Sequence, residues 1–325
     1  MWRRIRAWFG RSDVALDLGT ATLRVLEAGG DTVWTCPNAV AVATQHHDEI
    51  LAIGQEALAL AGREPAGVRV VRPFRAGRRQ DPKLANRLVR AMLRTALGGR
   101  AAAAARVAIA LPDPLDDGAK ARWERRAASL DVQAIRIVSR GDALAAGLHL
   151  TPDVEAPLVV DLGAATTSIH MFDAGHRVGG TTLDLAGDTL TATIVRHLAA
   201  NEGLDVGMGA AQRLKHSLHQ PGSAWVAGRC GRTGLPRGEM TSREALRGAL
   251  AEPTAALGAA IRGLIQHTPA DVAARAVQTG VLLVGDGAHL AGLEEALRAE
   301  TGLWTVVAET PEDLQVRGTL ALASA

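Results

Sequence analysis

The chain of 325 residues is poor in cysteine, lacks tyrosine, carries almost no net charge and contains no long apolar run. Its two cysteines, Cys36 and Cys230, lie far apart without metal-ligand spacing, which predicts reduced thiols and not a disulfide framework. The formal charge of +2 creates no global field that would attract nucleic acid. No apolar stretch approaches the roughly 20 residues of a membrane span, and the basic N-terminus lacks the apolar segment of a secretory signal. These absences predict a cytoplasmic protein.

What remains is the composition of an ordinary globular protein, with 47% hydrophobic and 22% charged residues. The length suits two domains of roughly 150 residues each. Segments typical of strands alternate with segments typical of helices, which predicts an α/β protein. The loosest segments are residues 60–69 and 219–239, and we expect loops or small insertions there.

The first eleven residues, MWRRIRAWFGR, have a strongly two-sided helical projection. Large apolar side chains fill one arc of about 120°, and arginines fill the opposite side. The pattern predicts an amphipathic helix on anionic lipid. Docking on the protein's own surface and a disordered tail are the alternatives, because a helix this short is marginal in water. The residues expected to contact the membrane are Trp2, Arg3, Arg4, Ile5, Trp8 and Phe9.

One turn motif occurs twice, as VALDLGTAT at residues 14–22 and as VVDLGAATT at residues 159–167. Small residues in such a turn let the backbone approach a phosphate, and exposed N–H groups and hydroxyls can bind its oxygens. The aspartate at each strand end can hold a hydrated Mg²⁺. A single copy indicates only a tight hairpin. Two copies, with a later strand, glycine turn and helix at VLLVGDGAHL, predict two related halves that bind a nucleotide.

These turns resemble those of the MreB-like bacterial actins, within the actin-like ATPase superfamily. Segments along the whole chain follow that family in order, among them PNAVAV, AIGQEA, VVRPFRAG, AQRLKHSL, GLPRGEMTSREALRGALAEP and AETGLWTVVAETPEDLQVRGTLAL. The resemblance implies an α/β actin-like fold of two related domains, or four subdomains, around a central nucleotide cleft. A small-molecule kinase of the same superfamily is the less favoured alternative, because it would need larger insertions.

The resemblance also implies domain boundaries. The N-terminal membrane helix would cover residues 1–11. Domain I would cover 12–146, with its small subdomain at 32–69 and the C-terminal residues 312–325 returning to it. Domain II would cover 147–311, with its small subdomain at 186–252.

ATP and Mg²⁺ are the cofactors that the resemblance implies, with Mg²⁺ held through water by Asp17 and Asp161. Thr166 would serve both binding and catalysis. The residues expected to bind the nucleotide are Asp17, Gly19 and Thr20 in the first turn, Asp161, Gly163, Thr166 and Thr167 in the second, Gln212 and Lys215 on a helix at the ribose and base, and Gly285, Asp286 and Gly287 in the adenosine turn.

Three departures from the family pattern affect chemistry. Ala164 and Ala165 replace two glycines of the second turn, where each Cβ reduces the room for phosphate and penalises a positive φ. Asp286 places a carboxylate in the adenosine turn. Arg140 stands where the family has the glutamate that orients the attacking water, and a guanidinium stays protonated and cannot act as a base. Asp142 is a weak substitute, so ATP hydrolysis is expected to be slow or lost.

Two functions follow from these observations. The first is a membrane-associated filament protein on the inner face of the cytoplasmic membrane, which self-associates, binds ATP and organises cell shape or wall synthesis with partner proteins. The second is a degenerate actin-fold scaffold that no longer hydrolyses ATP and acts through protein partners. Arg78 and Arg79 replace an apolar run of the family, which would exchange apolar insertion for electrostatic contact with lipid.

Overall fold

The computed structural model describes residues 13–46, 49–115, 117–151 and 158–324. The expected membrane helix at residues 1–11 therefore lies outside the described residues. The chain forms two compact units, one of residues 1–151 with 312–325 and one of residues 152–311. Within the described ranges, no helix has both the length and the apolar character needed to cross a membrane.

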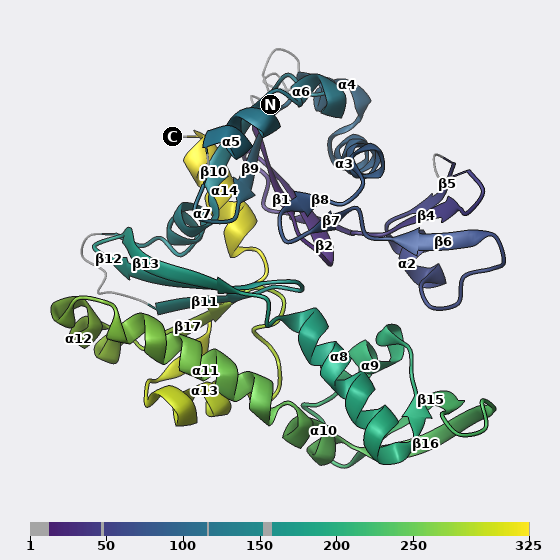
Figure 1. The fold of residues 1–325 in the computed structure, drawn as a ribbon. Helices are drawn as coiled ribbons and strands as arrows, with labels where there is room; N and C mark the ends of the chain where they lie inside the picture. Colours follow the sequence, from purple (N-terminus) through teal and green to yellow (C-terminus); the bar gives the residue numbers. More distant parts are fainter. Residues whose placement is uncertain (1–12, 47–48, 116, 152–157, 325) are drawn as a thin grey trace. The chain divides into compact units, whose positions relative to one another are not determined.

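Unit 1 is built on a five-stranded sheet in the order β10-β9-β1-β2-β3 (Figure 1). The unit also contains a separate three-stranded sheet in the order β5-β4-β6 and the two-stranded β7–β8 hairpin. Its strands are β1 (Asp13–Leu18), β2 (Thr22–Glu27), β3 (Trp34–Pro37), β4 (Val40–Ala43), β5 (Ile50–Ile53), β6 (Val68–Val71), β7 (Phe74–Arg75), β8 (Arg78–Arg79), β9 (Arg106–Leu111) and β10 (Ala134–Ser139). Its helices are α2 (Gln55–Leu60), α3 (Pro82–Leu97), α4 (Gly99–Ala104), α5 (Asp117–Glu124), α6 (Ala127–Leu130), α7 (Arg140–Gly147) and α14 (Leu314–Ser324).

Unit 2 has its own five-stranded sheet in the order β13-β12-β11-β17-β18 and a small sheet in the order β14-β15-β16 (Figure 1). Its strands are β11 (Leu158–Leu162), β12 (Thr167–Asp173), β13 (His176–Leu183), β14 (Leu204–Asp205), β15 (Ser223–Cys230), β16 (Pro236–Ser242), β17 (Val281–Val284) and β18 (Thr305–Val307). Its helices are α8 (Gly187–His197), the π-helical η1 (Leu198–Glu202), α9 (Met208–His216), α10 (Arg243–Ala249), α11 (Ala251–Gln266), α12 (Ala270–Thr279) and α13 (Leu293–Thr301).

The two large sheets have the same topology, which confirms the duplication predicted from the repeated turn. In each unit the strand that ends in Asp-Leu-Gly is central, antiparallel to the strand after the turn and parallel to a later strand. The registers also agree, because Asp17 pairs with Arg24 and Asp161 pairs with Ser168, seven residues on in both cases. Each aspartate therefore occupies the equivalent position of its sheet.

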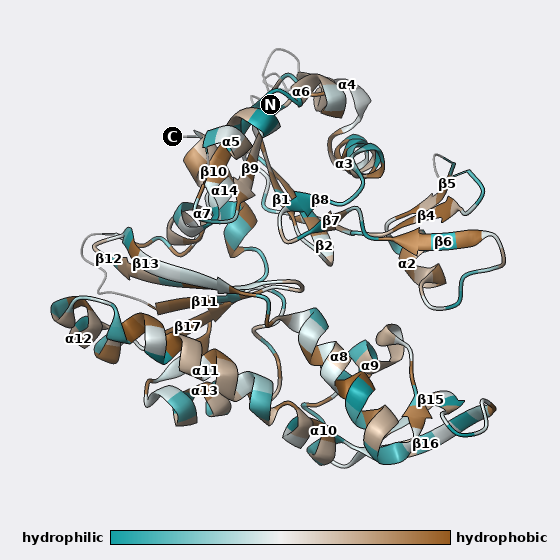
Figure 2. Cartoon of the chain, in the orientation of Figure 1, coloured by the Kyte–Doolittle hydropathy of each residue, from teal (hydrophilic) through white to brown (hydrophobic). Residues whose placement is uncertain are grey.

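Side chains along β1 alternate between the two faces of the sheet. Val14, Leu16 and Leu18 belong to the large apolar core of unit 1, whereas Ala15 packs against α14 on the other face. Asp17 shares the face of Ala15. In unit 2 the core strand β17 is apolar throughout and β11 is apolar except for Asp161, whereas the edge strand β13 is more polar (Figure 2). Asp17 and Asp161 therefore lie near the C-terminal ends of strands whose other side chains are apolar.

Helix α14 returns the C-terminus to unit 1 and packs closely on α7. Two glycines make this approach possible. A Cβ on Gly318 would lie 1.7 Å from the carbonyl oxygen of Ala143, and a Cβ on Gly147 would lie 2.2 Å from that of Leu314. Because α14 also carries Gln315, this packing places an amide beside the first turn.

The expectation of a loop over residues 219–239 is wrong. The segment contains β15 and the start of β16, which form an antiparallel hairpin with β14 on its edge. Ala224 and Val226 face the core of the small sheet, while Trp225 between them is 65% exposed. The alternation is that of a strand with one buried face, but small and charged residues conceal it in the sequence.

Candidate nucleotide-binding turns

The first turn, Gly19-Thr20-Ala21, is fixed by the residues around it. A Cβ on Gly19 would lie 2.3 Å from the carbonyl oxygen of Thr22, so only glycine fits. The hydroxyl of Thr20 accepts a hydrogen bond from the N–H of Ala76 at 2.9 Å. The buried Asn38 donates to the carbonyl of Thr20 at 2.8 Å. The turn is therefore held in shape before any ligand arrives.

Asp17 is buried and already has polar partners. Its Oδ1 accepts a hydrogen bond from Nε2 of Gln315 at 2.9 Å. Its Oδ2 lies 3.7 Å from Nη1 of Arg24, whose Nε lies 3.5 Å from Oδ1 of Asp313. Arg24 is only 6% exposed, so solvent screens this pair weakly. The positive charge of Arg24 opposes the attraction of a cation to Asp17.

The second turn accommodates its two alanines without backbone strain. Neither Ala164 nor Ala165 has a positive φ. The N–H of Gly163 donates to the carbonyl of Thr166 at 3.1 Å and closes the hairpin. The predicted penalty for alanine at a positive φ therefore does not arise, although both methyl groups still occupy space at the turn.

The second turn also rests on the first residues of α8. The N–H of Gly187 donates to the carbonyl of Gly163 at 3.0 Å, and that of Asp188 donates to the carbonyl of Ala164 at 2.7 Å. The N-terminal end of α8 therefore lies against the turn, where its dipole favours a nearby anion.

The two threonines of the second turn differ in their surroundings. Thr167 is fully buried, and its hydroxyl donates to the carbonyl of Leu185 at 2.5 Å. Thr166 is half-buried at the end of the turn. Thr166 is thus the better placed of the two for a phosphate.

The adenosine turn packs directly on the second turn. Gly285 has a φ of 85°, and a Cβ there would lie 2.5 Å from Oδ1 of Asp161. The N–H of Gly287 donates to the carbonyl of Leu162 at 2.9 Å. Asp286, between the glycines, is exposed. The structure thus brings Asp161 and the adenosine turn together, as the sequence motifs suggested.

Helix α9 contributes a polar row to the same region of unit 2. Nζ of Lys215 donates to the carbonyl of Gly187 at 2.8 Å and is buried. Oε1 of Gln212 accepts from the hydroxyl of Thr191 at 2.6 Å, and its Nε2 lies 2.7 Å from Nε2 of His216. Burial lowers the pKa of His216, and Lys215 lowers it further, whereas Asp286 acts in the opposite direction. Gln212 and Lys215 therefore lie beside α8 and the second turn.

Arg140 is the first residue of α7, directly after β10. The N-terminus of this helix is capped twice. Oγ of Ser139 accepts from the N–H of Asp142 at 3.2 Å, and Oδ2 of Asp113 accepts from the N–H of Gly141 at 2.7 Å. Asp142 is exposed in the first turn of the helix. The structure thus has a carboxylate next to residue 140, but it comes from Asp113, which the sequence analysis did not consider.

Sequence reasoning also missed Arg24, Gln315 and Asn38. The signal for Arg24 was available, because aligning the two turns places it opposite Ser168. Gln315 and Asn38 lie far from the first turn in the sequence, and only the fold brings them to it.

The residues present fit a nucleotide with a hydrated cation. Glycines stand where a Cβ would collide, helix α8 directs its N-terminus at the second turn, and Asp161 lies beneath the adenosine turn. No group of three or more potential metal ligands occurs among the described residues. These residues therefore provide no site in which three or more side chains could coordinate a metal ion directly. Single carboxylates at strand ends suit Mg²⁺, which retains its waters.

Two duplicated sheets of the same topology, each with an Asp-Leu-Gly turn, define an actin-like protein. Solved structures agree: MreB5 of Spiroplasma citri bound to AMPPNP superposes with a TM-score of 0.90 at 21% identity, covering 97% of this chain and 96% of that one. A chain of the MamK double helical filament gives a TM-score of 0.78 at 20% identity over 97% and 99%.

The family follows from the sequence comparison. Residues 11–325 match the family described as MreB/Mbl protein, and the chain belongs to that family. It is 25% identical to the cell shape-determining protein MreB of Escherichia coli strain K12, over 98% of this chain and 94% of the relative. It is also 25% identical to the cell shape-determining protein Mbl of Bacillus subtilis strain 168, over 94% of each. The family and the fold that the sequence motifs predicted are confirmed.

Proposed function

We propose that this chain is a membrane-associated bacterial actin that binds ATP, assembles into filaments and organises cell shape or wall synthesis, with hydrolysis slow or lost. The observation that supports ATP binding most directly is the arrangement of Asp161, the adenosine turn and the start of α8 around one turn. The Spiroplasma citri relative was crystallised with AMPPNP and with ADP, which supports the same ligand class here.

In this proposal the chain's own residues bind and orient the phosphates. The N–H groups and hydroxyls of the turns at Gly19-Thr20 and Gly163-Thr166 bind phosphate oxygens. Asp161 and Asp17 hold Mg²⁺ through its waters, and the cation supplies charge neutralisation for the phosphates. Gln212 and Lys215 contact the ribose and base.

Hydrolysis also needs a group that orients a water, and the residue at that position is Arg140. A guanidinium can stabilise phosphate charge, as an arginine finger does, but it cannot accept a proton. The exposed Asp142 remains a weak candidate. We therefore expect ATP to be bound for long periods and cleaved slowly if at all.

Assembly and membrane contact rest on other observations. MamK, a structural neighbour, forms a double helical filament, which supports self-association. The amphipathic pattern of residues 1–11 supports attachment to anionic lipid on the inner face of the cell membrane. Partners in cell-wall synthesis are proposed from the relatives, whose names describe the determination of cell shape.

The second candidate function is a scaffold that no longer depends on ATP. The observation that favours it is Arg24, whose buried charge faces Asp17, where the equivalent residue in unit 2 is Ser168. Together with Arg140, it reduces the cation-binding and catalytic capacity of unit 1.

Calorimetric titration of Mg-ATP into the wild type, Asp161→Asn and Asp205→Asn tests the proposal. The wild type and Asp205→Asn should bind equally, because Asp205 pairs with Arg229 on an exposed surface away from the turns. Asp161→Asn should bind at least about tenfold more weakly, since a neutral amide loses the charge that attracts the hydrated cation. Failure of the wild type to bind would favour the scaffold.

A further inference from the structure

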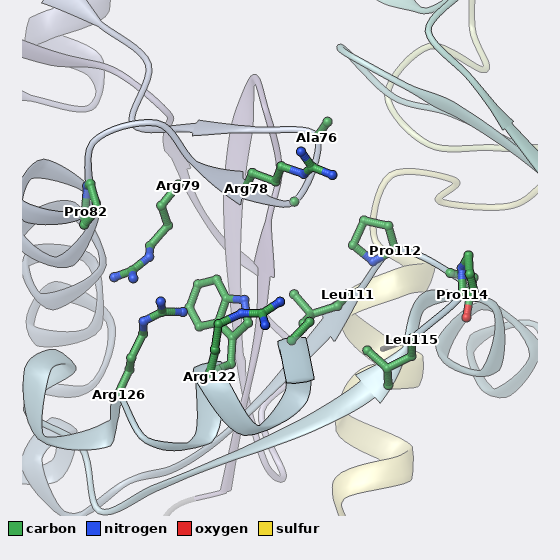
Figure 3. Close-up of a pocket in the computed structure, with 14 residues that line it drawn as sticks. Ala76, Arg78, Arg79, Pro82, Leu111, Pro112, Pro114, Leu115, Arg122 and Arg126 are labelled. Atoms are coloured by element: carbon green, nitrogen blue, oxygen red, sulfur yellow. The ribbon is translucent and has the colours of Figure 1, made fainter. Parts of the chain in front are cut away.

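A basic cavity of about 630 Å³ lies within unit 1, and no residue of the first Asp-Leu-Gly turn is among those that line it. Its walls are the β7–β8 hairpin, helix α5 with Arg126 at the N-cap of α6, and the segment that follows β9 (Figure 3). Four arginines line it: Arg78, Arg79, Arg122 and Arg126. In Figure 3, Arg79 and Arg126 extend toward each other from opposite walls.

The cavity holds two of these guanidinium groups in fixed positions. The guanidinium carbons of Arg79 and Arg126 each lie 5.4 Å from the ring centroid of Trp123. Trp123 is only 6% exposed, so its ring is a rigid support. Nη1 of Arg79 also donates to Oδ1 of Asn86 at 2.9 Å. These contacts reduce the conformational entropy that the two side chains would lose when an anion binds.

The charges in the cavity are unbalanced. Among the described residues that line it, four are arginines and one is a carboxylate, Asp113, which accepts the N–H of Gly141. Burial lowers the pKa of Arg79, and the charge of Arg126 lowers it further. Burial likewise lowers the pKa of Arg126, followed by the charges of Arg122 and Arg125. The protonated arginines therefore repel one another, and an anion among them would remove that repulsion.

We propose that this cavity binds a phosphate-bearing anion. Guanidinium groups form paired, charge-assisted hydrogen bonds with phosphate oxygens, and several arginines match a group with two or more negative charges. The volume is within the range of small-ligand sites. Trp123 is too buried to stack on a base, so the ligand is recognised by its phosphates, whether they belong to a soluble polyphosphate or to a lipid headgroup.

The cavity is separate from the first turn but contacts it through one hydrogen bond. Ala76 and Gly77 form the tip of the β7–β8 hairpin, and both have positive φ. A Cβ on Gly77 would lie 2.6 Å from Cδ of Pro112, so the tip packs tightly on the opposite wall. The N–H of Ala76 donates to Thr20 of the turn. Nucleotide binding must therefore be measured in parallel when the cavity is altered.

Titration of inorganic pyrophosphate into the full chain tests the proposal. The altered protein carries Arg79→Gln with Arg126→Gln, and the matched control carries Arg69→Gln, an exposed arginine of β6 in the same unit. The wild type and the control should bind equally. The double variant should bind at least about tenfold more weakly, because it loses two charged donors. Its melting temperature without pyrophosphate should stay close to that of the wild type, because relief of the repulsion offsets the lost contacts with Trp123 and Asn86.

A second arm separates the two sources of phosphate. Co-sedimentation with phosphatidylglycerol vesicles compares the double variant with Arg69→Gln, so that any contribution of residues 1–11 is the same in both. The cavity is assigned to a lipid headgroup if only the double variant loses sedimentation and if pyrophosphate reduces the sedimentation of the control. Equal sedimentation with impaired pyrophosphate binding assigns it to a soluble polyphosphate.

The proposal is overturned if pyrophosphate binds neither the wild type nor the control, or binds all three proteins equally. Equal binding would place the anion elsewhere, including the nucleotide turns. Titration of Mg-ATP into the same proteins distinguishes failure of the cavity proposal from failure of the proposed function. Pyrophosphate binding at the cavity does not require that the chain bind ATP.

Discussion

At the scale of single residues, the two duplicated aspartates have become unequal. Asp17 and Asp161 occupy equivalent positions, but the residue paired across the strand is Arg24 in one unit and Ser168 in the other. The arginine lies 3.7 Å from Asp17 in a nearly solvent-free environment. Arg24, which also contacts Asp313, thus offsets part of the negative charge of Asp17, and we expect Asp161 to attract a cation more strongly.

This difference predicts that the same substitution reduces the affinity for Mg-ATP by different factors at the two positions. Asp17→Asn should weaken Mg-ATP binding by less than about threefold, because Arg24 already offsets the charge that is removed, whereas Asp161→Asn should cost at least about tenfold. Titration calorimetry of the two variants side by side measures the ratio. A larger effect at Asp17 than at Asp161 would contradict the assignment.

The two cysteines should also differ in reactivity. Hydrogen bonds from Thr233 lower the pKa of the Cys230 thiol to about 7, whereas burial raises the pKa of Cys36. Iodoacetamide should therefore modify Cys230 first at pH 7.5, and the rate should fall about eightfold at pH 6 as the thiolate becomes protonated. Mass spectrometry of timed samples measures both rates, and Thr233→Ala should slow the reaction at Cys230. Preferential modification of Cys36 would refute this prediction.

At the scale of elements, the contact between α7 and α14 joins the C-terminus to the region of residue 140. Gly318→Ala should lower the free energy of unfolding by about 3 kcal/mol, because its Cβ would lie 1.7 Å from the carbonyl oxygen of Ala143 and the helices must separate. Gly263→Ala in α11 is the matched control, with nothing within 4 Å of the added carbon. It should raise stability by up to about 1 kcal/mol. Urea denaturation of both variants checks this, and equal effects would show that the close approach is relaxed in solution.

Individual helices and strands could be predicted from the sequence wherever local signals were strong. The period of two in β1 and the cap of α3, where Asp81 accepts the N–H of Leu84 at 3.0 Å before Pro82 opens the helix, are visible in the residues themselves. The hairpin of β15 and β16 was missed because Trp225 faces outward and the buried side chains are small. Local pattern could not reveal which strands would pair.

The residues of the candidate site likewise include some that could be predicted from the sequence and some that could not. Asp161 and Gly285 could be predicted because each lies in a recognisable turn. Asp113 and Gln315 could not, since they reach residues 141 and 17 only through the packing of distant elements. The basic cavity around Trp123 was also hidden, because Arg79 and Arg126 are separated by α3, α4, β9 and α5 in the sequence.

At the scale of the whole molecule, membrane attachment is predicted to depend on residues 1–11. Replacing Trp2 and Trp8 together by Asp should reduce co-sedimentation with anionic vesicles at least about tenfold, because burial of both indole rings is lost. Mg-ATP binding should be unchanged, because neither residue belongs to the turns that are proposed to bind the nucleotide. Unaltered sedimentation would mean that residues 1–11 do not contact lipid.

The central claim is that this member of the MreB/Mbl family keeps a nucleotide-binding fold but has lost the carboxylate that orients water. Phosphate release from Mg-ATP on anionic vesicles, measured for the wild type and for Arg140→Glu, tests it most directly. We expect no release above background from the wild type and measurable release from Arg140→Glu, with ATP bound by both proteins. Turnover by the wild type at the rate of Arg140→Glu would contradict the account and would make Asp142 and Asp113 the next residues to replace.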